Sequence, residues 1–300
     1  RYYEDNQNPF TDGTVRKAKA TKKKYHSEIS YQPDLPEAGK YAVYVSYQSL
    51  PKSVTDAKYI VYHKGEATEF SVNQRMGGGT WVYLGTFDFD KGCNTLNRVV
   101  VTNQASKRGV VTSDAVRFGG GMGNILRGNN SSGMPRCLEG ARYYAQWAGA
   151  PYHVYGGRKG ANDYADDINT RSLMTNWLGG GSPYMPALQG KKVPIELSLA
   201  VHSDAGYNKD GKTTWGSLAI CTTNFNDGML NSGISRMTSK DLAKALLKNL
   251  VSDLRQQYGE FSERYLWDRN YSETRLPEVP AAIIETLSHQ SFPDMKIGQD

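Results

Sequence analysis

Hydrophobic and polar positions alternate along the first part of the chain with a period of two. This pattern is typical of half-buried strands, and it recurs in short runs between residues 31 and 120. The predicted strands cover residues 41–47, 57–63, 69–74, 80–87, 97–102 and 113–118. Glycine-rich or polar turns separate the runs, and no helical period lies between them. We therefore expect an antiparallel β-sandwich over residues 31–120.

The segments that flank this region have a different composition. Residues 1–30 are polar and rich in lysine without a clear period, and we interpret them as an arm or linker. Residues 121–133 are rich in glycine and asparagine, which is typical of a linker. The remainder, residues 134–300, then forms a second domain.

Strand and helix patterns alternate in this second domain. Leucines recur at every fourth residue from 242 to 254, which predicts an amphipathic helix over 240–258 that ends before Gly259. Other predicted elements are a helix from Pro135 to Gly149, a strand at 152–155, a helix over 162–177, and strands at 193–201 and 278–284. This order favours an α/β fold with a mainly parallel sheet.

Two of these strands begin with a proline-led apolar run and end at an ionisable residue. The first leads into His202 and the second into Glu285. Chemistry in open α/β sheets gathers at such strand exits. A lone histidine at a strand end is more often held there by hydrogen bonds, and Glu139, near a predicted helix start, is more often a solvated acid. A histidine and a carboxylate nevertheless suit Zn²⁺, with a separate glutamate to accept a proton.

Composition limits the possible partners. Hydrophobic residues make up 38% and charged residues 22%, as in an ordinary globular chain, and no apolar run approaches the roughly 20 residues that span a bilayer. The net charge of +6 favours an anionic polysaccharide or a carboxylate-bearing bacterial wall. Much of the excess lies in residues 16–24, a cluster more typical of a solvated arm than of a nucleic-acid site, so we expect no nucleic-acid partner.

The first predicted domain resembles a known module. The residue strings that carry the likeness are 39–47, 70–74, 78–87 and 114–118, and together they resemble the golvesin C-terminal-like domain. That module, also found in bacterial xanthan lyases, is a β-sandwich regarded as carbohydrate-binding-like. The resemblance implies a glycan-binding accessory role and transfers no individual binding residue.

The second domain resembles the zinc-dependent N-acetylmuramoyl-L-alanine amidases of the type-3 catalytic fold. The matching strings are 137–142, 163–171, 199–206 and 282–289. The resemblance implies that Glu139 and His202 bind zinc and that Glu285 is the catalytic acid/base. We expect further contacts around this site from Asp204, His289 and Arg171.

The chain departs from the amidase pattern in two places. Thr286-Leu287-Ser288-His289 stands where the family usually continues with Gly-Phe after the catalytic glutamate. A strand ending in His-Gly, which supplies another zinc ligand in the family, is not visible before Glu139. We therefore expect this further histidine upstream of residue 1, with the β-sandwich inserted into the amidase domain and residues 1–30 a remnant of its N-terminal part.

The sequence thus leads to a zinc-dependent peptidoglycan amidase of the bacterial cell envelope, periplasmic or secreted. Its expected partners are peptidoglycan or muropeptides, or another anionic polysaccharide. One alternative is a non-catalytic binding protein for polysaccharide or cell wall, with a degenerate amidase domain. A second alternative is a polysaccharide enzyme similar to xanthan lyase.

Overall fold

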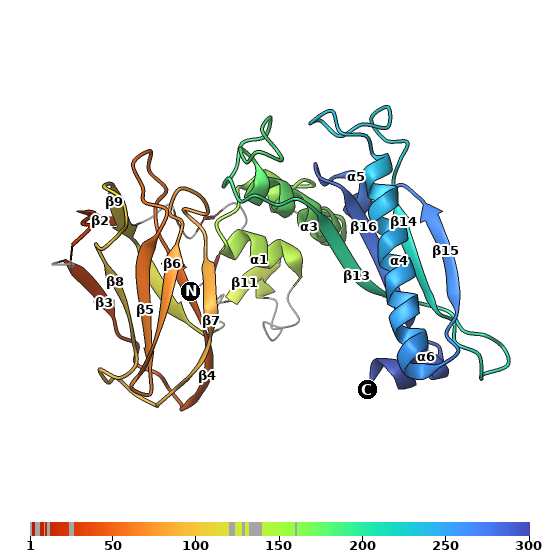
Figure 1. Cartoon of the computed structure of the whole chain (residues 1–300), viewed down its shortest axis with the longest axis horizontal. Helices are drawn as coiled ribbons and strands as arrows, with labels where there is room; N and C mark the ends of the chain where they lie inside the picture. Colours follow the sequence, from red (N-terminus) through yellow and green to blue (C-terminus); the bar gives the residue numbers. More distant parts are fainter. Residues whose placement is uncertain are drawn as a thin grey trace. The chain divides into compact units, whose positions relative to one another are not determined.

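A computed structural model gives the fold of the chain (Figure 1). It describes residues 2–3, 7–8, 10, 13–23, 27–119, 124–127, 130–131, 140–159 and 161–300, with the backbone alone for 2–3, 124–127 and 130–131. The chain divides into two units, and each is described by itself. Unit 1 contains Arg1–Asp166 and Lys191–Val193, and unit 2 contains Asp167–Gly190 and Pro194–Asp300.

Unit 1 contains the predicted antiparallel β-sandwich. One sheet has the strand order β3-β8-β5-β6 and another has the order β10-β4-β7, while β2 pairs with β9, and all these pairs are antiparallel. The strands are β2 (Arg16–Lys19), β3 (Glu28–Tyr31), β4 (Gly39–Ser46), β5 (Ala57–His63), β6 (Glu66–Val72), β7 (Val82–Phe89), β8 (Arg98–Thr102), β9 (Val110–Ser113) and β10 (Ala115–Phe118).

The alternating pattern places the core of the sandwich where the sequence predicts it. Val43 and Val45 of β4, Val61 of β5, Phe89 of β7 and Val99 of β8 are buried in one cluster. Because β4 and β7 belong to one sheet and β5 and β8 to another, this cluster joins the inner faces of two sheets. The prediction of an antiparallel sandwich is confirmed.

The flanking segments differ from their predicted role as linkers. Residues 16–19 and 28–31, expected in an arm, form β2 and β3 and pair with β9 and β8. Their polar side chains face outward in short edge strands, so the hydrophobic pattern that marks a strand is weak there. Within the predicted linker 121–133, β11 (Asn124–Arg127) pairs with β12 (Asn130–Ser131) and, in parallel, with β1 (Tyr2–Tyr3).

In the described residues of unit 1, two short helices follow the sandwich, α1 (Ala141–Trp147) and α2 (Tyr152–Tyr155). The expectation of a strand at 152–155 is wrong. The carbonyl oxygen of Tyr155 accepts a hydrogen bond from Nε of buried Arg142 at 2.8 Å, so a side chain rather than a neighbouring strand satisfies it. Four residues between Pro151 and Gly156 are too few for periodicity to separate a helical turn from a strand.

Unit 2 is built on a mixed four-stranded sheet with the order β13-β16-β14-β15 in the described part of the chain. The strands are β13 (Ser198–Asp204), β14 (Ser217–Cys221), β15 (Glu263–Asp268) and β16 (Ala281–Ser288). The pairs β13–β16 and β14–β15 are parallel, whereas β14 and β16 are antiparallel. The expectation of a mainly parallel sheet therefore needs correction: β14 runs against its central neighbour β16.

The predicted helix over 240–258 is α4 (Met237–Tyr258), and it covers one face of this sheet. Its buried apolar side chains are Ala243, Leu247 and Val251, which contact alternate residues of β14 and β16. The predicted leucine stripe, from Leu242 to Leu254, lies one position to the side and is partly buried around them.

Shorter helices complete unit 2. The division between the units falls inside α3 (Asp163–Gly179), and α5 (Ser272–Arg275) and α6 (Phe292–Gly298) flank β16. The sheet face opposite α4 has its own apolar cluster, formed by Leu218, Ile220 and Ile283 with Trp267 against them. Among the described residues, no helix is long and apolar enough to cross a membrane.

Candidate functional site

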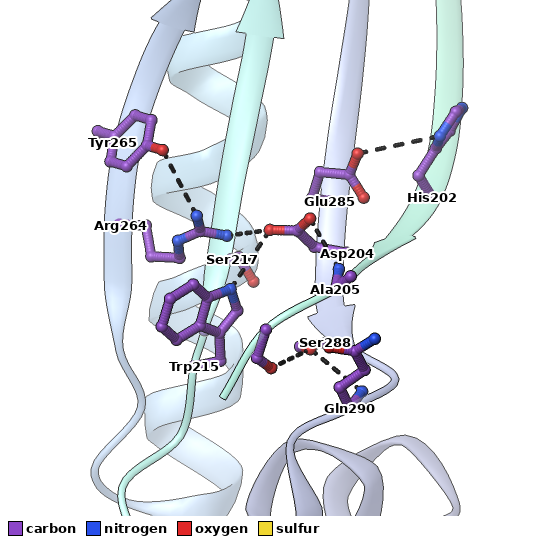
Figure 2. Close-up of polar contacts among 12 residues, drawn as sticks. His202, Asp204, Ala205, Trp215, Ser217, Arg264, Tyr265, Glu285, Ser288 and Gln290 are labelled. Atoms are coloured by element: carbon purple, nitrogen blue, oxygen red, sulfur yellow. Dashed lines mark hydrogen bonds and ion pairs between the residues drawn. The ribbon is translucent and has the colours of Figure 1, made fainter. Parts of the chain in front are cut away.

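His202 and Glu285 lie directly opposite each other on the parallel strands β13 and β16. Nδ1 of His202 is 3.9 Å from Oε1 of Glu285, and both side chains project from the face of the sheet opposite α4 (Figure 2). Both residues are predicted at strand exits, but they lie inside their strands. The pairing continues past them, with a bulge between His202 and Asp204.

A third residue, Glu273 of α5, completes this group, and sequence reasoning missed it. Nε2 of His202 is 2.9 Å from Oε2 of Glu273. The other carboxylate oxygen of Glu273 is 3.3 Å from a guanidinium nitrogen of Arg171, on α3. Arg171, expected near the site, therefore reaches it through Glu273. A lone glutamate in a four-residue helix carries no spacing signal that would mark it.

The environment separates the acidities of the two glutamates. Burial raises the pKa of Glu285. Burial also acts on Glu273, but its hydrogen bond to His202, with the charges of His202 and Arg171, outweighs burial and leaves its pKa lowered. The same hydrogen bond raises the pKa of His202. Two carboxylates with pKa values moved in opposite directions are typical of acid/base sites.

Glu285 also has an unsatisfied polar atom. Its Oε2 is buried and has no hydrogen-bond partner among the described residues. Such an orphaned carboxylate oxygen costs about 1–3 kcal/mol, so it calls for a functional explanation. A group that accepts a proton from bound water needs an oxygen of this kind.

Asp204, at the end of β13, anchors a second polar group beside the first (Figure 2). Its Oδ2 pairs with the guanidinium of Arg264 on β15 and accepts a hydrogen bond from Nε1 of Trp215 at 3.3 Å. The backbone N–H of Ala205 donates to its Oδ1 at 2.8 Å. Burial opposes ionisation of Asp204, but these bonds, led by that of Arg264, outweigh it and lower its pKa.

The other expected site residues lie elsewhere. His289 is exposed in the turn after β16, where its Nδ1 is 3.2 Å from Oγ of Ser203 and its backbone N–H donates to the carbonyl of Asp204. It supports the end of β13 through these two bonds. Glu139 lies outside the described residues.

Buried Asp294 of α6 holds the loops beneath this site. Its carboxylate accepts hydrogen bonds from the backbone N–H groups of Trp215 at 2.7 Å, Gly216 at 3.0 Å and Ser288 at 2.9 Å. These bonds tie the start of β14 to the end of β16. The same carboxylate thus fixes the backbone of Trp215, whose ring donates a hydrogen bond to Asp204.

The described side chains at this site are of the types that bind zinc, but they are too few to form a complete zinc site. One imidazole and the carboxylates of Glu273 and Glu285 are the ligand types zinc takes in catalytic sites. Within the described ranges, no group of three or more His, Cys, Asp or Glu side chains is arranged to hold a metal ion. The predicted ligand set includes Glu139, which lies outside the described residues.

Comparison with known proteins gives the clearest likeness for the sandwich. Residues 6–120 match the family model of the golvesin C-terminal domain. A curated xanthan lyase of Bacillus sp. (strain GL1) is 35% identical over 92 residues, which is 30% of this chain and 10% of that enzyme. The chain therefore spans about a tenth of the length of this relative.

Two solved structures show more distant likeness. The Paenibacillus xanthan lyase is 25% identical, with a TM-score of 0.32 over 38% of this chain and 11% of that chain. The N-acetylmuramoyl-L-alanine amidase of Clostridium difficile 630 is 19% identical, with a TM-score of 0.25 over 42% of this chain and 51% of that chain. These scores are too low to support an argument about fold or activity. The likeness that is supported is a golvesin C-terminal-type sandwich over residues 6–120, as the first resemblance implied.

Proposed function

We propose that the protein is a zinc-dependent peptidoglycan amidase that hydrolyses the bond between N-acetylmuramic acid and L-alanine at the bacterial cell envelope. The main support for the proposal is the pairing of His202 with Glu285 on neighbouring strands. Glu285 has a raised pKa, and its buried Oε2 has no hydrogen-bond partner among the described residues. The motif resemblance of residues 199–206 and 282–289 supports the same roles. The golvesin-like sandwich is then a glycan-binding accessory.

In this proposal, His202 and Glu139 would hold zinc, together with the further histidine that the amidase resemblance implies. Zinc, when bound, polarises the lactyl carbonyl and lowers the pKa of water at the site. Glu285 accepts a proton from the attacking water, whose oxygen bonds to the carbonyl carbon. The carbon–nitrogen bond then breaks, and Glu285 passes the proton to the leaving amine of L-alanine. The raised pKa of Glu285 suits a group that must both take and return a proton.

Glu273 and Arg171 have a supporting role in this scheme. The carboxylate of Glu273 contacts the imidazole of His202 and is itself held by Arg171, so the ring has a fixed orientation. Neighbours that orient ligand side chains in this way commonly affect metal affinity and activity by about 10- to 100-fold.

The test is hydrolysis of purified cell wall by the full-length protein. The protein, loaded with zinc, is incubated with sacculi, and new L-alanine amino termini are measured. We expect their release to stop after chelation and to return when zinc is added back. A zinc-loaded preparation that binds sacculi but releases no L-alanine termini would overturn the proposal.

One observation favours a second candidate, a wall-binding protein without catalysis. Nε2 of His202 is held by Glu273, and its Nδ1 lies 3.9 Å from Oε1 of Glu285, so each ring nitrogen already faces a carboxylate. A protein that keeps both contacts binds polysaccharide or wall without holding zinc. Metal analysis of the purified protein distinguishes the two, because an amidase retains about one zinc per chain. The alternative of a lyase is supported by the xanthan lyase match, which covers 10% of that enzyme, and we do not propose it.

A further inference from the structure

Strand β15 and the turn after it carry a row of aromatic side chains that packing only partly uses. Tyr265 and Trp267 have ring centroids 5.9 Å apart, and Trp267 and Tyr271 are 6.3 Å apart, both in edge-to-face contact. Tyr265 is 48% exposed and Tyr271 45% exposed, whereas Trp267 is half-buried. We call Tyr265, Trp267 and Tyr271 the aromatic strip.

The aromatic strip lies on the same side of the sheet as Glu285. Trp267 contacts the apolar cluster of Leu218, Ile220 and Ile283, on the face that α4 does not cover. Side chains two residues apart on a strand share a face. Glu285 therefore lies on the same side as Ile283, and Tyr265 lies on the same side as Trp267. Figure 2 shows Tyr265 and Glu285 on this face, on different strands of the sheet.

The aromatic strip also extends toward His202 and Glu273. Tyr271 is followed by α5, whose Glu273 contacts His202. A ligand that lies along β15 and its following turn therefore extends from the Arg264–Asp204 pair to the His202–Glu273 contact.

Arginines accompany the strip. The guanidinium of Arg269 lies 4.8 Å from the Trp267 ring centroid, and that of Arg264 lies 5.3 Å from the Tyr265 ring and 4.6 Å from the Trp215 ring. Arg264 is paired with Asp204. Arg269 is exposed, and no carboxylate within the described part of the chain pairs with it. Its charge is therefore available to an anionic ligand.

We propose that the aromatic strip, with Arg269, binds a glycan strand whose attached peptides carry carboxylate groups. Aromatic rings with one exposed face accept the apolar faces of sugar rings, and their hydroxyl groups bond to the sugar hydroxyls. A guanidinium recognises a carboxylate through two parallel hydrogen bonds. The proposal rests on the proposed function, because the carboxylate-bearing glycan beside Glu285 is then the wall substrate itself.

Binding is measured separately from hydrolysis, with the full chain carrying Glu285→Gln. Two soluble probes are titrated: a neutral tetramer of N-acetylglucosamine, and a disaccharide-tetrapeptide fragment of peptidoglycan. We expect Tyr265→Ala and Tyr271→Ala each to weaken both probes by about 10-fold, equivalent to about 1.4 kcal/mol. Arg269→Gln should weaken only the carboxylate-bearing probe.

Phe292→Ala is the matched control. Phe292 is 70% exposed on α6, which Figure 1 places at the end of the sheet opposite α5. Its replacement should leave both affinities unchanged. Equal binding of both probes by the Tyr265, Tyr271 and control variants overturns the proposal. If the protein with Glu285 intact releases no L-alanine termini but glycan binding still depends on the aromatic strip, the proposed function alone is overturned. If it is an active amidase and glycan binding does not depend on the strip, the proposal for the strip alone is overturned.

Discussion

His202 and Glu285 are partners in the register of two parallel strands, with 3.9 Å between Nδ1 and Oε1. The two residues are far apart in sequence, so the sheet alone brings them together. Their separation is therefore set by the backbone ladder between β13 and β16 rather than by a flexible loop. This makes the roles of both side chains testable by substitutions that leave the strands intact.

The first prediction concerns Glu285 as the acid/base. Glu285→Gln keeps the side-chain shape but cannot accept a proton, so release of L-alanine termini should fall by about 10²- to 10⁴-fold. Zinc content and the far-ultraviolet circular dichroism should stay unchanged. Glu260→Gln, an exposed glutamate of the same unit, is the control and should keep full activity. Similar activity in both variants would remove Glu285 from the mechanism.

The second prediction compares two histidines of unit 2. His202→Ala removes the predicted zinc ligand, so the purified variant should retain far less than one zinc per chain. His289→Ala removes an exposed ring that contacts Ser203, and zinc should be retained. Elemental analysis after dialysis is the measurement. Equal zinc in the two variants would show that His202 is not a ligand.

The third prediction concerns Asp204 and Arg264, which join the end of β13 to β15. Asp204→Asn leaves a largely buried guanidinium without its charged partner. We expect the free energy of unfolding of unit 2 to fall by about 1.5–3 kcal/mol, as for hydrogen bonds to charged groups. Urea unfolding measures this change. Asp210→Asn, in an exposed loop, should have a much smaller effect, and equal losses would contradict a specific role for the pair.

The fourth prediction concerns Asp294, whose carboxylate accepts three backbone N–H groups from the segments around β14 and β16. Asp294→Ala leaves these buried donors unsatisfied, each at about 1–3 kcal/mol. We expect the variant to lose unit 2 at physiological temperature while the sandwich still unfolds cooperatively. Calorimetry should then show one transition where the parent shows two. Two unchanged transitions would contradict this role.

The fifth prediction concerns the pH dependence of the sandwich. Burial raises the pKa of Tyr47 from 10.0 to about 12, and its hydroxyl donates to the carbonyl of Met76 at 2.7 Å. Because the folded pKa lies above the unfolded value, the contribution of Tyr47 is complete below pH 10 and is lost as pH rises toward 12. Each pKa unit corresponds to about 1.4 kcal/mol.

The matched variant is Tyr47→Phe, which cannot ionise. At pH 8 the parent sandwich should be more stable than the variant, because the variant lacks the hydrogen bond to Met76. Between pH 10 and 12 this advantage should shrink and then reverse. Denaturant midpoints at pH 8, 10 and 11.5 are the measurement. A constant difference between parent and variant would contradict the pKa shift.

Much of the fold could be predicted from periodicity, because both faces of the sandwich strands are clearly marked. Val43 and Val45, for example, are buried on either side of the half-buried Tyr44 in β4. The short strands β2 and β3 could not be recognised. Three of the four residues of β2 are charged and exposed, and β3 contributes two side chains, Ile29 and Tyr31, to the core. β14 was also missed: all of Ser217–Cys221 is buried, so it has no alternation to detect.

The site was predictable in part. His202 and Glu285 follow proline-led apolar runs, and the structure brings them together, although their chemical roles remain predictions. Glu273 reaches His202 only because α5 folds back beside β13 and β16, and no local pattern encodes that contact. Trp215 and Arg264 contact Asp204 because the sheet brings these segments together, and no local pattern encodes those contacts either.

β16 is hydrogen-bonded to β13 on one side and to β14 on the other. A strand held along both edges opens only when much of its unit unfolds, so the amide protons near Glu285 should be among the slowest in unit 2 to exchange with solvent. The carboxylate proposed to move protons would thus stay in place through the local fluctuations that release the surrounding loops.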